Sequence, residues 1–131
     1  MAHHVPIIPA GSETQYDRFH FAPATRVGDT VHVSGVIGTG PDGKCDPDPA
    51  TQFGSAFSQL GEVLKAAGGS LDDVVEMTSF HVGLNEHMRA FMAAKDEHLS
   101  EPWPAWTAIG CTELAMPGGL AEIRATAHIP T

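Results

Sequence analysis

The sequence predicts an α+β domain in which one sheet has two helices on one face, in the order β-β-α-β-α-β-β. Three observations support this: two segments with helical spacing of apolar residues, short β-branched segments around them, and a last segment that alternates strictly. The chain has 131 residues, 42% of them hydrophobic, which is enough for one domain with a core. We therefore assign residues 1–131 to one domain and expect residues 1–17 to form an irregular N-terminal arm.

The first two strands are expected before residue 40. Val31-His32-Val33 is short and β-branched, and the glycine-rich segment 34–43 after it predicts a strand end and a turn. Residues 19–22 are the candidate for a first strand that pairs with it. Ser34-Gly35 either offers backbone donors to an anion or is a plain strand end.

A helix with clear boundary signals follows. Asp48 can cap it, Pro49 suits its first turn, and Gly68-Gly69 can end it. Gly54 and Gly61 either permit close approach of a neighbouring strand or are only tolerated, each at a cost of about 1 kcal/mol. The apolar stripe of this helix consists of Phe53, Ala56, Phe57, Leu60, Val63, Leu64 and Ala67.

The next strand and helix are predicted over residues 74–82 and from residue 85 onward. The strand should place Val75, Met77, Ser79 and His81 on one face. Asn85 can cap the second helix, and Pro102 and Pro104 end this element. Its inner face is expected to carry Met88, Phe91, Met92, Lys95 and Leu99, with the aliphatic part of Lys95 along the stripe.

Two final strands are expected at about residues 106–114 and 120–129. In the last strand Ile123, Ala125, Ala127 and Ile129 point one way, and Glu122, Arg124, Thr126 and His128 point the other. The apolar row should face the helices, and the chain has no third helix for the polar row. That face therefore meets either water or other subunits around a polar cleft.

Glu122 and Arg124 are the candidate functional pair on this face, about 7 Å apart at roughly 3.3 Å per residue. A carboxylate beside a fixed cation can orient a substrate and activate a water, but the same pair can be an ordinary surface ion pair. Trp103 and Trp106 bracket Pro104. They are candidates for core residues, interface residues or a wall that stacks on a ligand.

Charge and composition exclude several function classes. The net charge of −9 and the scatter of the seven Lys and Arg residues disfavour nucleic acid as the main ligand. The eight histidines lack metal-ligand spacing, so we expect no metal and no cofactor, although His81 and His128 could share the open face. No apolar run is long enough to span a membrane, and two cysteines fit a reducing compartment, so a cytoplasmic location is expected.

Several segments between about Arg18 and Pro130 form a specific pattern. They are residues 28–35 (GDTVHVSG), 66–75 (AAGGSLDDVV), 84–85 (LN), 104–105 (PA) and 122–123 (EI). In these segments the chain resembles the RidA family, also called YjgF/YER057c/UK114. Residues 77–81 (MTSFH) and 104–110 (PAWTAIG) are most similar to the YjgH-like branch of that family.

The resemblance implies a chorismate-mutase-like α+β subunit that assembles as a homotrimer, with the sheets inward and a cleft between each pair of subunits. It implies a small-molecule ligand in that cleft. The best-known activity of the family is hydrolysis of reactive enamines and imines, such as 2-aminoacrylate, to a ketoacid and ammonia. In the family an arginine holds the substrate carboxylate and a glutamate handles the attacking water.

The match of site residues is partial. Glu122 matches the glutamate and is the candidate catalytic residue, and Ser34 and Gly35 match a cleft serine and glycine. Other family positions differ: Trp106 stands for the arginine, Phe21 for a tyrosine, Ala108 for a cysteine and Phe91 for a helix asparagine. The candidate ligand-binding residues are therefore Phe21, Ser34, Gly35, Phe91, Trp106, Thr107, Ala108 and Arg124.

The loss of the arginine changes the expected substrate. An indole donates one hydrogen bond and cannot replace a bidentate guanidinium–carboxylate contact. We therefore expect poor hydrolysis of small imino acids and an aromatic cleft for a bulkier or less charged metabolite, unless Arg124 bends into it. Three functions stay open: an imine or enamine deaminase-type hydrolase, a non-catalytic small-molecule-binding trimer and, least favoured, an endoribonuclease or translation inhibitor.

Overall fold

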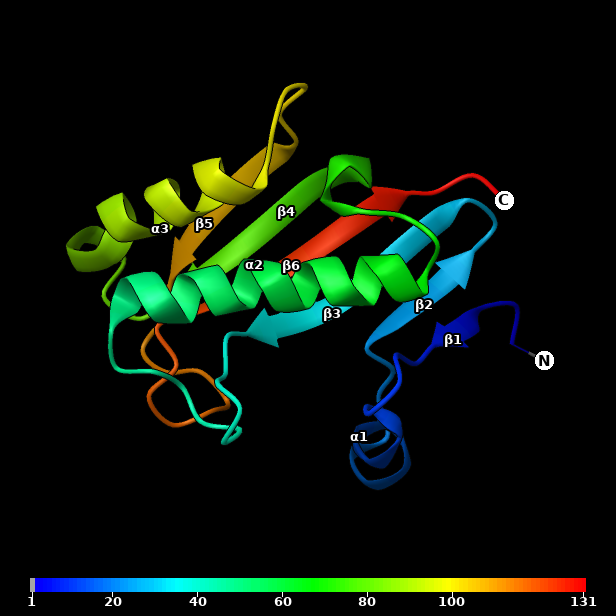
Figure 1. Cartoon of the computed structure of the whole chain (residues 1–131), viewed down its shortest axis with the longest axis horizontal. Coiled ribbons are helices and arrows are strands. Elements are labelled where there is room, and N and C mark those ends of the chain that lie inside the picture. Colours follow the sequence, from blue (N-terminus) through cyan, green and yellow to red (C-terminus); the bar gives the residue numbers. More distant parts are fainter. Residues whose placement is uncertain (1) are drawn as a thin grey trace.

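Six strands form one sheet in the computed structural model, which describes residues 2–131 (Figure 1). Their order is β1-β2-β3-β6-β4-β5, and every neighbouring pair is antiparallel except the parallel pair β4–β5. The strands are β1 (Val5–Ile7), β2 (Ala24–Val27), β3 (Thr30–Ile37), β4 (Val74–His81), β5 (Ala105–Gly110) and β6 (Ala121–His128).

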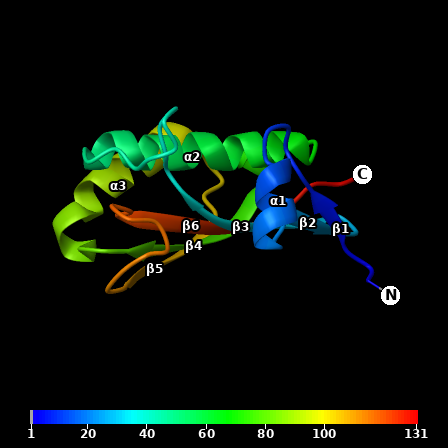
Figure 2. The same cartoon turned by 90° about the horizontal axis from the view of Figure 1, so that it is seen from below.

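Two long helices, α2 (Pro49–Ala66) and α3 (Leu84–His98), cover one face of this sheet (Figure 2). The short helix α1 (Glu13–Phe19) lies beside β1 and β2, and a 3-10 helix (Leu71–Asp73) precedes β4. Within residues 2–131 no helix lies across the opposite face of the sheet. The predicted α+β class and the order from β2 to β6 are therefore confirmed, with β1 and α1 as additional elements.

The expectation of an irregular N-terminal arm over residues 1–17 is wrong. β1 pairs with β2 at Val5 and Arg26, and α1 follows it. The first strand is also not at residues 19–22, because α1 ends at Phe19 and His20 turns the chain with a left-handed φ of 58°. A three-residue strand and a seven-residue helix are too short to produce a periodic pattern in the sequence.

The predicted ends of α2 are confirmed. The carboxylate of Asp48 accepts hydrogen bonds from the Thr51 hydroxyl at 2.7 Å and from the Thr51 backbone N–H at 3.1 Å. These bonds lower the pKa of Asp48, because they stabilise its charged form. Beyond the helix, Gly68 has a φ of 88°, a conformation that favours glycine after a helix C-terminus.

The two glycines within α2 are not sites of close strand approach. A Cβ at Gly54 would meet no atom within 4 Å, and one at Gly61 would meet only the side chain of Leu71, at 3.7 Å. Of the two alternatives that the sequence left open, the structure supports tolerance of these glycines.

α3 starts earlier than predicted, and its buried face matches the predicted one except at Met92. Its N-cap is Gly83 with a φ of 73°, and no side chain caps it, so the role expected for Asn85 is wrong. Phe91 and Ala94 are its buried residues, whereas Met92 is 44% exposed. Phe91 and Leu99 are buried as predicted, and Ala94 is buried where Met92 was expected to be.

A bulge in β4 changes the predicted alternation of that strand. Val74 pairs with Ala127, and Glu76 pairs with the next residue, Thr126, so Val75 is an extra residue in the ladder. Val75 is accordingly 50% exposed, while Val74 and Met77 both face the core. The prediction that Val75 shares the inner face of Met77 is wrong for this reason.

The core lies between the helices and the sheet. The ring of Phe91 is 5.4 Å from that of Phe53 and 5.5 Å from that of Phe57, measured between centroids. All three rings are fully buried, and each contributes about 1.5–3 kcal/mol to folding through removal of apolar surface from water. Among residues 2–131 no helix is both long and apolar enough to cross a membrane.

A buried polar side chain joins the loops at one end of the sheet. The amide nitrogen of Gln52 donates to the carbonyls of Asp46 and Gly118, each at 3.0 Å, and its oxygen accepts from Leu120 N–H at 2.7 Å. Gln52 is fully buried, so these three bonds satisfy a group that would be costly to bury without partners. Gln52 thereby connects α2 to two loops, the one that precedes α2 and the one that precedes β6.

Candidate functional site

The uncovered face of the sheet carries the polar row of β6. Glu122 pairs with Ile37 of β3 on one side and with Phe80 of β4 on the other. Directly paired residues of neighbouring strands have side chains on the same face. Arg124, next along this row, pairs with Thr78. The predicted alternation of β6 is confirmed, because Ala121, Ile123, Ala125 and Ala127 are buried.

Glu122 lies against the backbone of Gly35. Two residues of β3, Ser34 and Gly35, stand opposite the single residue Arg124, which makes a β-bulge. A Cβ placed on Gly35 would overlap Oε1 of Glu122 and would lie 2.6 Å from its Cδ. Glycine is therefore required here for the carboxylate to occupy this position beside the bulge.

Among residues 2–131, neither Glu122 nor Arg124 has an ion-pair partner. The salt bridges found in residues 2–131 are His87–Glu86 and Lys95–Asp96. Glu122 is half-buried and Arg124 is exposed, although they share one face. The alternative of an ordinary Glu122–Arg124 surface pair is therefore not what the structure contains, and both groups stay available for a ligand or another subunit.

Ser34 connects this site to the segment after α1. Its hydroxyl donates to the carbonyl of Ala22 at 2.7 Å, and its backbone N–H donates to the carbonyl of Pro23 at 2.9 Å. These bonds place residue 21 next to the bulge, and Phe21 is 42% exposed. Phe21, Ser34, Gly35 and Glu122 therefore belong to one region of the molecule.

Trp106 lies on the other face of the sheet from Glu122. Its indole Nε1–H donates to the hydroxyl of Ser79 at 2.8 Å, and its ring stacks on Phe91 with centroids 5.9 Å apart. Ala108 is on the same face as Trp106, whereas Thr107 pairs with Thr78 and lies on the open face. Within one chain, Trp106 and Glu122 therefore cannot line the same pocket.

The prediction that Phe91 contacts a ligand is wrong. Its side chain is fully buried between α2, His81 and Trp106, so it has no surface to offer. It supports the position of Trp106 from beneath. The helix spacing that placed Phe91 on the inner face of α3 was the correct guide to this residue.

A buried polar chain behind Trp106 was not predicted. Ser79 Oγ lies 2.7 Å from Nε2 of His81, whose ring is fully buried and has Phe91 at its edge. His81 therefore does not share the open face with His128. Burial lowers the pKa of His81, because it disfavours the charged form. Within residues 2–131, Nδ1 of His81 is a buried polar side-chain atom that lacks a hydrogen-bond partner.

Two concave regions of the chain lie away from these residues. Two open grooves of about 400 and 450 Å³ flank His98 on the helix side, and none of the predicted site residues line them. In the part of the chain that the structure describes, no cluster of three His, Cys, Asp or Glu residues could hold a metal ion. The predicted site is thus a surface of one chain, and a cleft requires a second wall.

The fold and this surface define a class: a two-layer α+β domain with an unpaired carboxylate on an uncovered sheet face. A family model described as Endoribonuclease L-PSP matches residues 15–129 of the chain. The chain belongs to this family, which is also the RidA or YjgF/YER057c/UK114 family. The resemblance inferred from the sequence motifs is therefore confirmed.

Individual relatives agree with this assignment. The chain is 38% identical to the RutC family protein YjgH of Escherichia coli (strain K12), over 99% of this chain and 98% of that protein. It is 33% identical to a 2-iminobutanoate/2-iminopropanoate deaminase of Dermatophagoides farinae, over 72% of this chain and 74% of that protein. A solved structure described as Protein YJGH superposes with a TM-score of 0.89, at 37% identity and 99% coverage of both chains.

Proposed function

We propose that the chain hydrolyses the C=N bond of an imine or enamine in a cleft between subunits of a homotrimer, with Glu122 handling the attacking water. The observation that carries this proposal is the unpaired Glu122 carboxylate, held beside the Gly35 bulge on an uncovered face. Similarity to a protein named as an iminobutanoate and iminopropanoate deaminase supports the reaction class.

The cleft in this proposal is built from two copies of the chain. One copy contributes Glu122 with Ser34, Gly35 and Phe21, and its neighbour contributes Trp106 and Ala108 from the opposite face of its sheet. This division follows from the placement of these residues on two faces of one sheet. It also agrees with the lining of the two grooves on the helix side, which does not include Glu122.

The reaction needs only a base and polar contacts. Glu122 accepts a proton from a water molecule, whose oxygen adds to the imine carbon to form a carbinolamine. The same carboxyl group returns the proton to nitrogen, which completes the neutral carbinolamine. The carboxylate then moves the hydroxyl proton of the carbinolamine to nitrogen as the C–N bond breaks, which gives a carbonyl and ammonia. An enamine first takes a proton on carbon to become the imine. A positioned acid–base group of this kind contributes about 10²–10⁴-fold to the rate.

The environment of Glu122 favours a substrate with apolar substituents. Its cross-strand neighbours Ile37 and Phe80 are apolar, and Trp106 stands in the family's arginine position. The carboxylate of a small imino acid would have no guanidinium to bind, because Trp106 takes the arginine position. We therefore propose a bulkier substrate. The two cysteines, Cys45 and Cys111, are free thiols, which fits the expected reducing compartment.

Glu122→Gln is the direct test. Imines generated in solution from a panel of amino acids should lose ammonia faster with the wild type than spontaneously, and the variant should lose about 10²–10⁴-fold of that acceleration. Glu76→Gln, which changes a carboxylate on the same sheet face, is the matched control and should stay within about twofold of wild type. Full turnover by Glu122→Gln, or no acceleration by the wild type across the panel, would refute the proposal.

A non-catalytic binding protein is the second candidate, and one observation favours it: the apolar Trp106 stands in the position of the family's arginine. Ligands that raise the melting temperature and are never converted would support it. Ribonuclease activity is disfavoured by the net charge of −9. It would be supported only by RNA cleavage that survives purification and is lost in Glu122→Gln.

A further inference from the structure

Lys95 is a nearly buried cation beside Trp106. It lies in the last turn of α3, and its side chain is 13% exposed. Its Nζ is 5.2 Å from the ring centroid of Trp106 and 5.5 Å from that of Trp103. These two residues are the only tryptophans in the chain, so both indoles are at this one cation. The faces of indole rings attract a cation through their negative quadrupole.

The Trp106 indole gives Lys95 a fixed partner. Its edge is held by the hydrogen bond to Ser79, and its ring rests on the fully buried Phe91. Trp103 differs, because it is 54% exposed and precedes β5 in the loop. The ammonium group therefore has one rigid aromatic neighbour and one whose surface is open to solvent.

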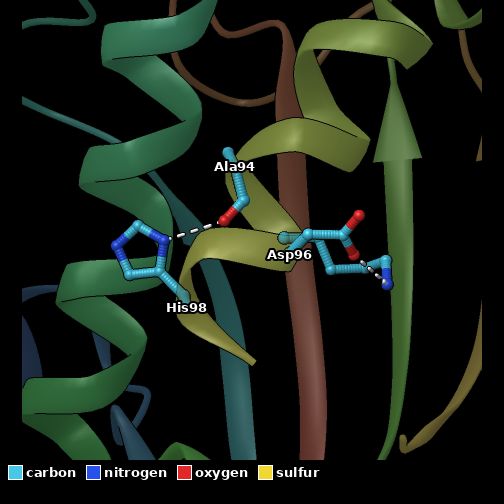
Figure 3. A network of polar contacts seen from close by, with 4 residues as sticks. Ala94, Asp96 and His98 are labelled. Carbon is cyan, nitrogen blue, oxygen red and sulfur yellow. Dashed lines mark hydrogen bonds and ion pairs between the residues drawn. The ribbon is translucent and has the colours of Figure 1, made fainter. Parts of the chain in front are cut away.

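The charge of Lys95 is only weakly compensated. Its partner is Asp96, whose Oδ1 is 3.3 Å from Nζ and whose side chain is 63% exposed (Figure 3). Adjacent residues on a helix do not face each other, and an ion pair with a solvated carboxylate contributes little free energy. An ammonium has three N–H donors, and in residues 2–131 the oxygen of Asp96 is the only acceptor bonded to Lys95.

We propose that Lys95 binds the anionic end of the ligand, with its carboxylate on the ammonium and its flat part against the exposed ring of Trp103. This inference rests on the proposed function, because it uses Trp106 as a wall of the cleft. It assigns a specificity-determining residue to a chain that has an indole in place of an arginine. Asp96 would turn into solvent when the carboxylate arrives.

The chemistry of this arrangement indicates the substrate class. A point charge flanked by two indoles suits a planar, conjugated monoanion better than a small aliphatic one. A 2-enamino acid with an aromatic side chain has this form, because its carboxylate, C=C bond and ring are conjugated and can be coplanar, and its imine tautomer is the species that is hydrolysed. The proposal therefore specifies a substrate that is bulkier than 2-iminopropanoate and still carries one negative charge.

The test uses phenylpyruvate, the stable ketoacid that hydrolysis of such an imine releases, and its uncharged methyl ester. Calorimetric titration of the full-length protein measures both affinities. Lys95→Met, which keeps the length of the stem, should weaken phenylpyruvate binding about tenfold or more and change binding of the ester less than twofold. Lys95→Arg should keep the acid within about threefold, and Lys65→Met on exposed α2 surface should change neither.

NMR signals of the two indole N–H groups distinguish ligand binding by Lys95 from a purely structural role of Lys95. In wild type and in Lys95→Met without ligand, the Trp106 signal should be similar, because its bond to Ser79 remains. Phenylpyruvate should shift the Trp103 signal in wild type. No saturable binding of phenylpyruvate to wild type, equal loss of acid and ester in Lys95→Met, or unchanged acid affinity in that variant would overturn the proposal.

Failure of the two proposals gives different results. If charge-dependent binding through Lys95 is present but no imine is hydrolysed, the proposed reaction is wrong. The assignment of Lys95 as a ligand-binding residue is then kept. If Glu122→Gln abolishes hydrolysis while Lys95→Met leaves the KM for aromatic imino acids unchanged, the reaction stands and the Lys95 inference is wrong.

Discussion

Gly35 is a glycine because the side chain of Glu122 occupies the space that a Cβ would need. This single contact connects the two residues of the candidate site that match the family most directly. Trp106 is fixed in a comparable way, since its N–H has Ser79 as acceptor and its ring has Phe91 beneath it. At the residue scale, therefore, the site depends on close packing around a carboxylate on one face and an indole on the other.

His81 gives a prediction at this scale. Its pKa lies below the usual 6.5 because of burial, so the unfolded chain binds more protons than the native chain just below pH 6.5. By linkage, the stability that depends on neutral His81 is fully present above pH 6.5 and is lost as the pH falls from 6.5 through the native pKa.

Urea unfolding of wild type and His81→Gln between pH 7.5 and 5 measures this effect. The difference in unfolding free energy between the two proteins should shrink toward acid pH, because the variant lacks the buried imidazole that must take up a proton. NMR titration of the His81 ring in wild type should give a pKa below 6.5. A His81 pKa at or above 6.5 would contradict the assignment.

At the scale of elements, side chains with several backbone partners hold the helices to the sheet. Gln52 does this at the N-terminal end of α2. Arg26 does it at the other end: its guanidinium donates to the carbonyls of Ala67 at 2.6 Å, Ile129 at 2.7 Å and Gly28 at 3.3 Å. Ala67 caps the C-terminus of α2, where carbonyls lack helical partners and a cation is favourable.

Replacement of Arg26 by Met should therefore destabilise the protein by about 2–3 kcal/mol, because charge-assisted bonds to partly buried carbonyls are lost. Denaturant unfolding followed by circular dichroism measures the change. Arg89→Met, at an exposed position of α3, is the control and should cost less than about 0.5 kcal/mol. Equal stability of the two variants would indicate that the Arg26 bonds contribute little.

At the scale of the whole molecule, the uncovered sheet face is the surface expected to meet other subunits. It carries the apolar side chains of Ile37, Phe80 and Ile109 in one row with Glu122, and Ile109 is 43% exposed. Exposed apolar side chains in this row are unfavourable against water. The trimer proposed from the family covers this row and supplies the second wall of the cleft.

Ile109→Lys tests this arrangement, because the residue is exposed in the single chain and the charge would be buried in an assembly. Light scattering should give a mass of three 13.8-kDa chains for wild type and a smaller assembly for Ile109→Lys, with a folded circular dichroism spectrum. Ala66→Lys, which adds the same charge on exposed α2, should stay trimeric. A monomeric wild type would refute both the trimer and the shared cleft.

The sequence by itself determined the existence of the two long helices, the ends of α2, the alternation of β6 and the family, because these depend on spacing and on motifs within short segments. Glu122, Ser34 and Gly35 could be selected as site candidates from those motifs. Only the tertiary structure decided that Trp106 lies on the helix face, that Phe91 is core and that Lys95 lies against two indoles. The reason is physical: strand order, bulges and side-chain packing depend on residues far along the chain. The spacing within a short segment does not specify which distant residues these are.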